Sequence, residues 1–525
     1  MKRIDKLTFK NFKFFVDEEV FDFERKNVLI YGENGSGKSS LYWGLYTFLQ
    51  SSLKEDSEIE KYFDKDDEEN LINQFIEEEN KDDVSISLKI EDSHSTVEEF
   101  KISKDTINTN KDTNTNIKRA NATSDFINYR LLSRFYDFRN SEVIDVWRLF
   151  EKEILEYITI DGDNLKDSWN ILKDGLAKVD SKYPTITSQT YKDFQDNLKL
   201  FNQTINTFLI SIIEKTNMLL RDNFKEKISI SIEYIDSVYN DFIEGSSTKR
   251  DRLVREPEII LKVKFNDKDI KRPHTFLNEA KLTAIALSLR FAILKTRLVS
   301  DDTLKILVLD DLLISLDMSH RLEVINIILN DEDLKDYQKI ILTHDRAFFE
   351  VAKDKFNSQE RSEWNYFEMF VDKDGDVEKP YIKKSLGYFE SAKKHFDEYD
   401  YPACANYLRK EVERLKKIKE AQEESINEDK KVFKKIKKML LSEDLMNNEK
   451  RGRIIGKLIG FKTAFEDDSD SLIEIDLRNI KSITDRILNP QSHDDTSRPL
   501  YKKELDEAIE IIQGVRDTII NGDNP

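Results

Sequence analysis

The most informative segment of the sequence is Asn27-Val28-Leu29-Ile30-Tyr31-Gly32-Glu33-Asn34-Gly35-Ser36-Gly37-Lys38-Ser39-Ser40. Its apolar run is typical of a buried parallel strand, and a helix is predicted from Lys38 to about Gln50. Between them, glycines let successive backbone N–H groups face phosphate oxygens, and the helix N-terminus adds its positive dipole end. We therefore expect a phosphate-binding loop rather than an ordinary glycine-rich turn. Its nucleotide-binding residues would be Asn34, Gly35, Ser36, Gly37, Lys38, Ser39 and Ser40.

A second apolar strand, Lys305-Ile306-Leu307-Val308-Leu309, ends in two carboxylates, Asp310 and Asp311. This pattern predicts the acidic partner of a phosphate-binding loop. Asp310 and Ser39 would hold Mg²⁺ beside the phosphates reached by Lys38, and Asp311 would polarise an attacking water. The other interpretation is a buried strand that ends in a solvated acidic turn.

The two motifs are about 270 residues apart, so the nucleotide-binding fold must be split by an insertion. Apolar residues at three-to-four spacing predict helices between 142 and 225, whereas residues 104–123 have the composition of a solvated loop. Strands are expected at Ile228–Ile235 and Glu258–Phe265. The predicted fold is an α/β P-loop head with an inserted helical arm, followed by an all-α domain. Its parts are 1–141 and 226–378 for the head, 142–225 for the arm and 379–525 for the C-terminal domain.

Composition narrows the class of protein. The 525 residues carry a net charge of −19, which argues against a protein that coats nucleic acid without specificity. A single cysteine, Cys404, excludes a disulfide framework and a cysteine-built zinc site. No run of about 18 apolar residues and no signal-peptide core occurs, so we expect a cytoplasmic protein without a membrane partner.

Several segments, taken in order, resemble the RecF/SMC-like branch of the ABC ATPases. They are the Ile4–Phe14 strand with Asn11-Phe12, the phosphate-binding loop, a diverged signature segment from Phe276 to Leu289, Leu316-Asp317 as a D-loop, and Thr343-His344-Asp345 as a switch histidine. The resemblance implies an ABC-type head that binds ATP and Mg²⁺ and forms a homodimer or higher oligomer. Two heads would sandwich two ATP molecules, with Asn278, Glu279 and Ala280 capping the partner's nucleotide. Asp311 and His344 would be the catalytic residues.

Three positions depart from the family pattern. The signature segment lacks Ser-Gly-Gly, and Asp311 stands where the family usually has glutamate. Because the aspartate is one methylene shorter, we expect slow hydrolysis, which suits a switch better than a motor. No glutamine stands at the expected Q-loop position, which is occupied by Phe126-Ile127-Asn128-Tyr129-Arg130.

The C-terminal region resembles HEPN-type helical domains and the anticodon nucleases PrrC and RloC. Arg409 and Glu413 lie one helical turn apart, and Arg486 and His493 follow far downstream. The resemblance implies a metal-independent RNase in which His493 is the general acid or base and arginine holds the phosphate. The other interpretations are a surface ion pair for Arg409 with Glu413, and a helix end for Arg486 with His493.

Two lysine clusters, at 416–419 and 430–438, are either solvated helix faces or contacts to RNA or DNA. Three functional hypotheses follow. The first is an ATP-gated switch that controls a C-terminal effector acting on RNA such as tRNA, in bacterial anti-phage defence or a stress response. The second is an ATP-gated sensor that recruits a separate effector protein, and the third is a RecF-like DNA-repair ATPase.

Overall fold

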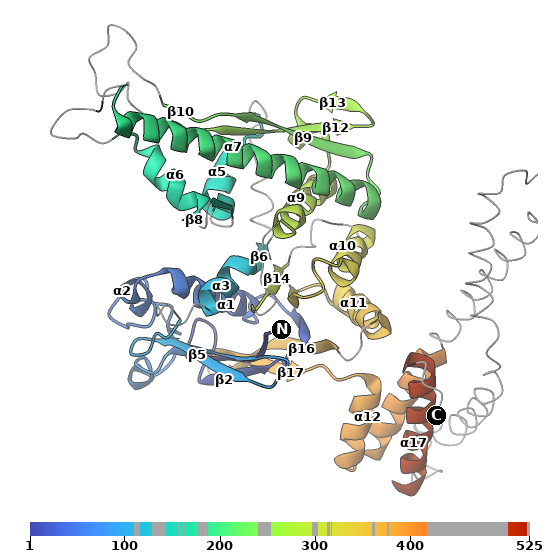
Figure 1. Cartoon of the computed structure of the whole chain (residues 1–525). Coiled ribbons are helices and arrows are strands. Elements are labelled where there is room, and N and C mark those ends of the chain that lie inside the picture. The colour runs from blue at the N-terminus through green and yellow to red at the C-terminus, as the bar shows by residue number, and fades with distance from the viewer. Residues whose placement is uncertain are drawn as a thin grey trace, which may run out of the picture. The chain divides into compact units, whose positions relative to one another are not determined.

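A computed structural model of the chain divides into two compact units, Met1–Lys384 and Ser385–Pro525 (Figure 1). Each unit is described by itself. The structure describes residues 1–109, 116–128, 143–155, 158–160, 163–176, 184, 187–239, 254–296, 303–311, 316, 318–359, 363–374, 377–416 and 502–521.

The first unit is centred on a six-stranded sheet with the order β17-β16-β3-β15-β14-β6. Five of these strands are parallel, and β17 pairs antiparallel with β16. The strands are β3 (Asn27–Gly32), β6 (Asp125–Asn128), β14 (Ile306–Asp310), β15 (Gln338–Thr343), β16 (Trp364–Asp374) and β17 (Val377–Lys384). The first four residues of β14 and all six of β15 are buried, as expected for parallel strands covered on both faces.

A four-stranded antiparallel sheet with the order β2-β1-β4-β5 packs against helix α1 (Lys38–Gln50) in one hydrophobic core. Its strands are β1 (Arg3–Lys10), β2 (Glu18–Asp22), β4 (Ser85–Glu91) and β5 (Val97–Ser103). A Cβ on Gly44 of α1 would lie 2.2 Å from the Phe9 ring, so only glycine allows this close approach. The charged segment 53–83 contributes Ile59, Phe63 and Ile72 to the same core.

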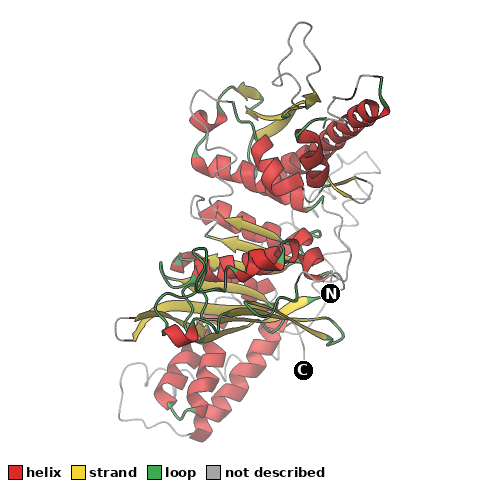
Figure 2. Ribbon diagram, turned by 90° about the vertical axis from the view of Figure 1, so that its left-hand side faces the viewer, coloured by secondary structure: helices red, strands yellow, loops and turns green. Residues whose placement is uncertain are grey.

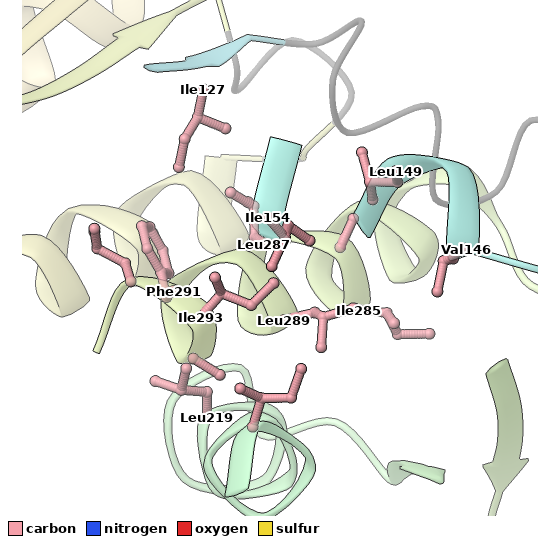
Figure 3. Close-up of a cluster of buried hydrophobic side chains, with 14 of the residues drawn as sticks. Ile127, Val146, Leu149, Ile154, Leu219, Ile285, Leu287, Leu289, Phe291 and Ile293 are labelled. Carbon is pink, nitrogen blue, oxygen red and sulfur yellow. The ribbon is translucent and has the colours of Figure 1, made fainter. Parts of the chain in front are cut away.

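A second layer is built around helix α9 (Glu279–Leu294), in which every residue from Leu282 to Leu294 is buried. A helix that is apolar on all sides must be covered on all sides. Figure 3 shows how Val146, Leu149 and Ile154 approach α9 on one side and Leu219 on the other. The elements that share this core are α5 (Trp147–Leu149), η3 (Phe150–Ile154), α6 (Leu165–Lys173), α7 (Gln189–Met218), η5 (Leu219–Asn223), β9 (Ile228–Ile235) and β12 (Glu258–Phe265). Strand β13 (Lys268–Ile270) pairs with β12 at the edge of their sheet.

Helices α10 (Met318–Asn330) and α11 (Arg346–Gln359) complete the first unit, and α11 lies against β3, β15 and β16. Figure 2 shows the fold with helices in red and strands in yellow. In the second unit, α12 (Tyr388–Asp397), a helix at 401–416 and α17 (Lys502–Asn521) share one small core. None of the helices in the described parts of the chain is long and apolar enough to cross a membrane.

Three expectations from the sequence need correction. Residues 116–123 of the expected solvated loop form a helix, α3 (Asn116–Thr123), because Ile117 and Ala120 are buried against the core that includes α1. The helices at 142–225 are no separate arm, since they share one core with β9, β12 and α9. The boundary expected at 378/379 falls inside β17, whose pairing with β16 keeps residues up to 384 in the first unit.

Candidate functional site

The predicted site residues follow strands that end at the same edge of the six-stranded sheet. The phosphate-binding loop follows β3, Asp310 ends β14, and His344 follows β15. Because β3, β15 and β14 are adjacent and parallel, their carboxyl ends lie side by side. This topology brings the two motifs together although about 270 residues separate them.

The loop has the backbone shape that phosphate binding requires. Gly35 and Gly37 have φ values of +87° and +100°, a region in which only glycine is unstrained. A Cβ on Gly37 would lie 3.0 Å from the Phe14 ring, so this glycine also permits close packing. The buried Ser36 hydroxyl has no hydrogen-bond partner among the described residues. Donors inside the loop are therefore available to an anionic ligand.

Lys38 occupies the centre of this loop. Its Nζ donates to the carbonyl oxygens of Gly32 at 2.5 Å and Glu33 at 3.0 Å. Burial lowers the pKa of the Lys38 ammonium, and the charges of Asp311 and Asp310 partly offset this fall. The lysine thus bonds to the loop's own carbonyl groups where a phosphate would offer stronger acceptors. Ser39, the expected metal ligand, is exposed beside it.

Asp310 is half-buried and lies in an electrostatically crowded position. Burial raises its pKa to about 7, the neighbouring Asp311 adds to the rise, and Lys38 and His344 oppose it. No group of three or more His, Cys, Asp or Glu side chains able to hold a metal occurs within the described ranges. Mg²⁺ is commonly held by one or two protein oxygens together with substrate phosphates.

Asp311 and His344 form a hydrogen-bonded pair. Asp311 Oδ1 is 2.9 Å from the backbone N–H of His344 and 2.9 Å from its ring Nδ1. Asp311 has a φ of +46°, and its own N–H donates to the carbonyl oxygen of Leu342 at 3.1 Å. The left-handed turn thus places the carboxylate against His344, the residue that follows β15.

The signature segment forms the exposed N-terminus of α9. Asn278 is the N-cap, and its side chain accepts a hydrogen bond of 3.1 Å from the N–H of Lys281. Asn278 and Glu279 are exposed and Ala280 is half-buried, so this helix end is accessible to an anion from another molecule. Lys281 pairs with Glu226 at 2.5 Å.

Sequence reasoning missed two connections around the site. Arg321 of α10 donates to the carbonyl oxygen of Leu316 at 2.8 Å and also pairs with Asp345, so it links the D-loop segment to the switch segment. Asn128, which ends β6, is paired in register with Asp310 and donates to the hydroxyl of Tyr42 at 2.9 Å. Asp317, Tyr129 and Arg130 lie outside the described residues.

A third missed feature is a buried ion pair behind the site. Arg290 of α9 contacts both carboxylate oxygens of Asp125, at 2.5 and 2.9 Å, and Glu153 at 3.5 Å. The available signal was that Arg290 is the one charged residue in the apolar run 282–294, so it needed a buried partner.

In the second unit, Arg409 Nε donates to Glu413 Oε1 at 3.0 Å on an exposed helix face. Arg486, His493 and the lysine cluster at 430–438 lie outside the described residues. A nearby residue that the sequence did not single out is Glu411, which is fully buried and pairs with Arg414 at 2.7 Å and Arg516 at 3.5 Å.

This chain is similar to several solved structures. A Pyrococcus furiosus Smc head domain with an extended coiled coil, solved with the C-terminal domain of ScpA, is 16% identical, and the match covers 76% of this chain and 100% of that chain with a TM-score of 0.42. RecF bound to ATP is 14% identical, with coverage of 73% and 98% and a TM-score of 0.39. No curated protein matches. The model of the RecF/RecN/SMC N terminal domain matches residues 3–363, more than half of the 525 residues, so this chain belongs to that family and carries an ATPase head of the RecF/SMC type.

Proposed function

We propose that this protein is an ATP-gated switch whose head engages a second head when ATP is bound. The observation that carries the proposal is the meeting of Lys38, Asp310, Asp311 and His344 at one sheet edge, close enough that their charges act on one another. These groups come from three strands and serve no evident purpose in the core. Their arrangement suits a polyphosphate with its metal ion.

In this proposal, residues 34–40 hold the phosphates, with Lys38 turning from the Gly32 and Glu33 carbonyl groups to the β- and γ-phosphates. Ser39 and Asp310 hold Mg²⁺, which supplies charge neutralisation on the phosphate oxygens. Asp310 must lose its proton to bind the metal, so its raised pKa makes Mg²⁺ binding weaker in acid.

Asp311 and His344 act as a unit on the hydrolytic water. Asp311 accepts a hydrogen bond from that water. Its contact with the imidazole ring fixes the orientation of His344. One carboxylate oxygen is already shared between the backbone N–H and the ring of His344, which leaves the other for the water. A short carboxylate restrained in this way predicts slow turnover.

Head engagement would place the Asn278–Ala280 end of α9 on the partner's nucleotide. The exposed N-terminus of this 16-residue helix offers a positive dipole end to an anion. Arg321 would transmit the state of the nucleotide, because it joins Leu316 to the residue after His344. Two engaged heads would form a homodimer, or a higher oligomer built from such pairs.

The second unit would be the effector, and the biological setting that we propose is bacterial anti-phage defence. Arg409 and Glu413 lie on one exposed face, which supports an Arg-Glu-His RNase site completed by His493, with Arg486 as a further candidate. RNA, in particular tRNA, is the proposed substrate. The competing proposals are a sensor that recruits a separate effector protein and a RecF-like repair ATPase that acts on DNA.

One experiment separates these functions. Purified protein is incubated with total tRNA or with gapped DNA, with and without ATP and Mg²⁺, and the nucleic acid is analysed on denaturing gels and by filter retention. ATP-dependent cleavage of tRNA supports the RNase effector, and retention without cleavage supports the sensor. ATP-dependent preference for gapped DNA would replace both with the repair function.

A further inference from the structure

A cavity of about 370 Å³ lies between helix α1 and the second layer of the head. It is lined on one side by α1 and on the other by residues of η3, α6 and α9. Asn128, the register partner of Asp310, lines the cavity as well. The volume is within the range of pockets that hold small ligands.

One wall of the cavity is aromatic. Tyr42, Trp43, Tyr46 and Phe126 contact one another edge to face in a closed set, with ring centroids 5.3 to 5.6 Å apart. Trp43 and Tyr46 keep exposed fractions of 42% and 37%, although Tyr42 and Phe126 are buried. Rigid rings that are held by their neighbours and still partly open provide a surface on which a flat ligand can stack.

The charged side chains that line the cavity determine whether it favours an anionic or a cationic ligand. Aromatic walls with carboxylates can hold a cation, but here Asp125 and Glu153 are both turned to Arg290, in contacts of 2.5 and 3.5 Å. Lys152 and Lys166 stand on the wall contributed by η3 and α6. The lining has three cationic and two anionic side chains, so it favours an anion in a chain whose net charge is −19.

Amide side chains that line the cavity can form hydrogen bonds with the edge of an aromatic base. The amides of Gln50 and Asn121 are joined by a hydrogen bond of 3.0 Å, which leaves further donors and acceptors on each. Asn128 donates a hydrogen bond of 2.9 Å to the hydroxyl of Tyr42 and also lines the cavity. Amide side chains of this kind recognise the donor and acceptor pattern of nucleobases.

We propose that this cavity binds a nucleoside monophosphate, with the base against Trp43 and Tyr46 and the phosphate beside Lys152 and Lys166. An aromatic platform, amide side chains and nearby cations together match the three parts of such a ligand. The site is separate from the phosphate-binding loop, so the proposal stands or falls independently of the ATP site.

Trp43 reports directly on binding. The chain has four tryptophans, and the other three, Trp147, Trp169 and Trp364, are at most 3% exposed. Titration of the Lys38→Ala variant, in which the phosphate-binding loop is disabled, with AMP, GMP, CMP and UMP should quench the fluorescence with a Kd below about 1 mM for at least one of them. Adenosine lacks the phosphate and ribose 5-phosphate lacks the base, so each should bind at least tenfold more weakly than the best nucleotide.

Variants then locate the signal. Tyr46→Ala should raise Kd about tenfold, since stacking of a base on an aromatic ring is worth that much or more. Lys152→Gln with Lys166→Gln should also raise Kd about tenfold, whereas Lys173→Gln, on the same helix as Lys166 but outside the cavity, should leave it unchanged. Calorimetry on Trp43→Phe checks that binding persists without the reporter, and circular dichroism checks that each variant folds.

Three outcomes would overturn the proposal. The first is that no monophosphate changes the fluorescence or releases heat. The second is that ribose 5-phosphate binds as well as the best nucleotide, which would make the cavity a plain anion site. The third is an unchanged Kd in folded Tyr46→Ala and in the double lysine variant, which would place the ligand elsewhere.

Discussion

Replacing Arg290 should destabilise the head strongly. Arg290 is 5% exposed and Asp125 is 2% exposed, and they meet through two hydrogen bonds. Arg290→Ala leaves the Asp125 carboxylate buried without its partner. At an effective dielectric constant of 20, two unit charges about 4 Å apart interact by about 4 kcal/mol. Breaking a buried pair costs about 3–5 kcal/mol in measured cases, so we expect a loss of that size in the free energy of unfolding.

The assay is urea unfolding followed by the fluorescence of the buried tryptophans, read as the shift in midpoint at constant slope. Asp125→Ala should cost a similar amount, and the double variant less than the sum, with a coupling of about 2 kcal/mol or more. Arg221→Ala is the control, because Arg221 forms an exposed pair with Asp222 and its loss should leave the midpoint unchanged. Additive effects, or a loss below about 1 kcal/mol for Arg290→Ala, would refute the reasoning.

The remaining predictions concern the nucleotide site and the effector. Lys38→Ala should abolish ATP binding and turnover, measured by calorimetry and phosphate release; turnover equal to that of the parent would exclude Lys38 from the site. Asp310→Asn should stabilise the ligand-free protein at pH 8, by at most about 4 kcal/mol, and should have no such effect at pH 4. The reason is the pKa of about 7 in the folded state, because of which the ionised carboxylate destabilises the fold increasingly as the pH rises from about 4 through 7. Equal melting temperatures of parent and variant at pH 8 would contradict the raised pKa of Asp310. His493→Ala and Arg409→Ala should each remove RNA cleavage or toxicity while ATPase activity stays intact, and folded variants with full biological activity would assign the effector to another protein.

Local elements with strong patterns were predictable from the sequence. The helix predicted at Lys38–Gln50 and the strands predicted at Ile228–Ile235 and Glu258–Phe265 have those bounds in the structure. These elements were predictable because the signals for them, the spacing of apolar residues and the residues at each end, are local in the sequence. Helix α3 was missed because its Asn, Thr and Lys residues resemble a loop, and only packing of Ile117 and Ala120 makes it a helix.

Contacts between distant residues were beyond the sequence. The apolar run around Arg290 indicated that it needed a partner, but nothing marked Asp125, 165 residues away, as that partner. The pairing of Asp311 with His344 likewise depends on two adjacent parallel strands. The motifs therefore identified the residues of the site, whereas strand order determined which of them meet.

The most direct test of the central claim is the mass of the Asp311→Ala variant in solution, measured by light scattering with ATP and Mg²⁺. Without Asp311 the bound ATP should persist, so the heads should remain engaged and the mass should be twice that of one chain. Asp311→Ala combined with Lys38→Ala should stay at the mass found without ATP. If Asp311→Ala binds ATP and yet remains a single chain at micromolar concentration, ATP does not join two heads and the switch mechanism is wrong.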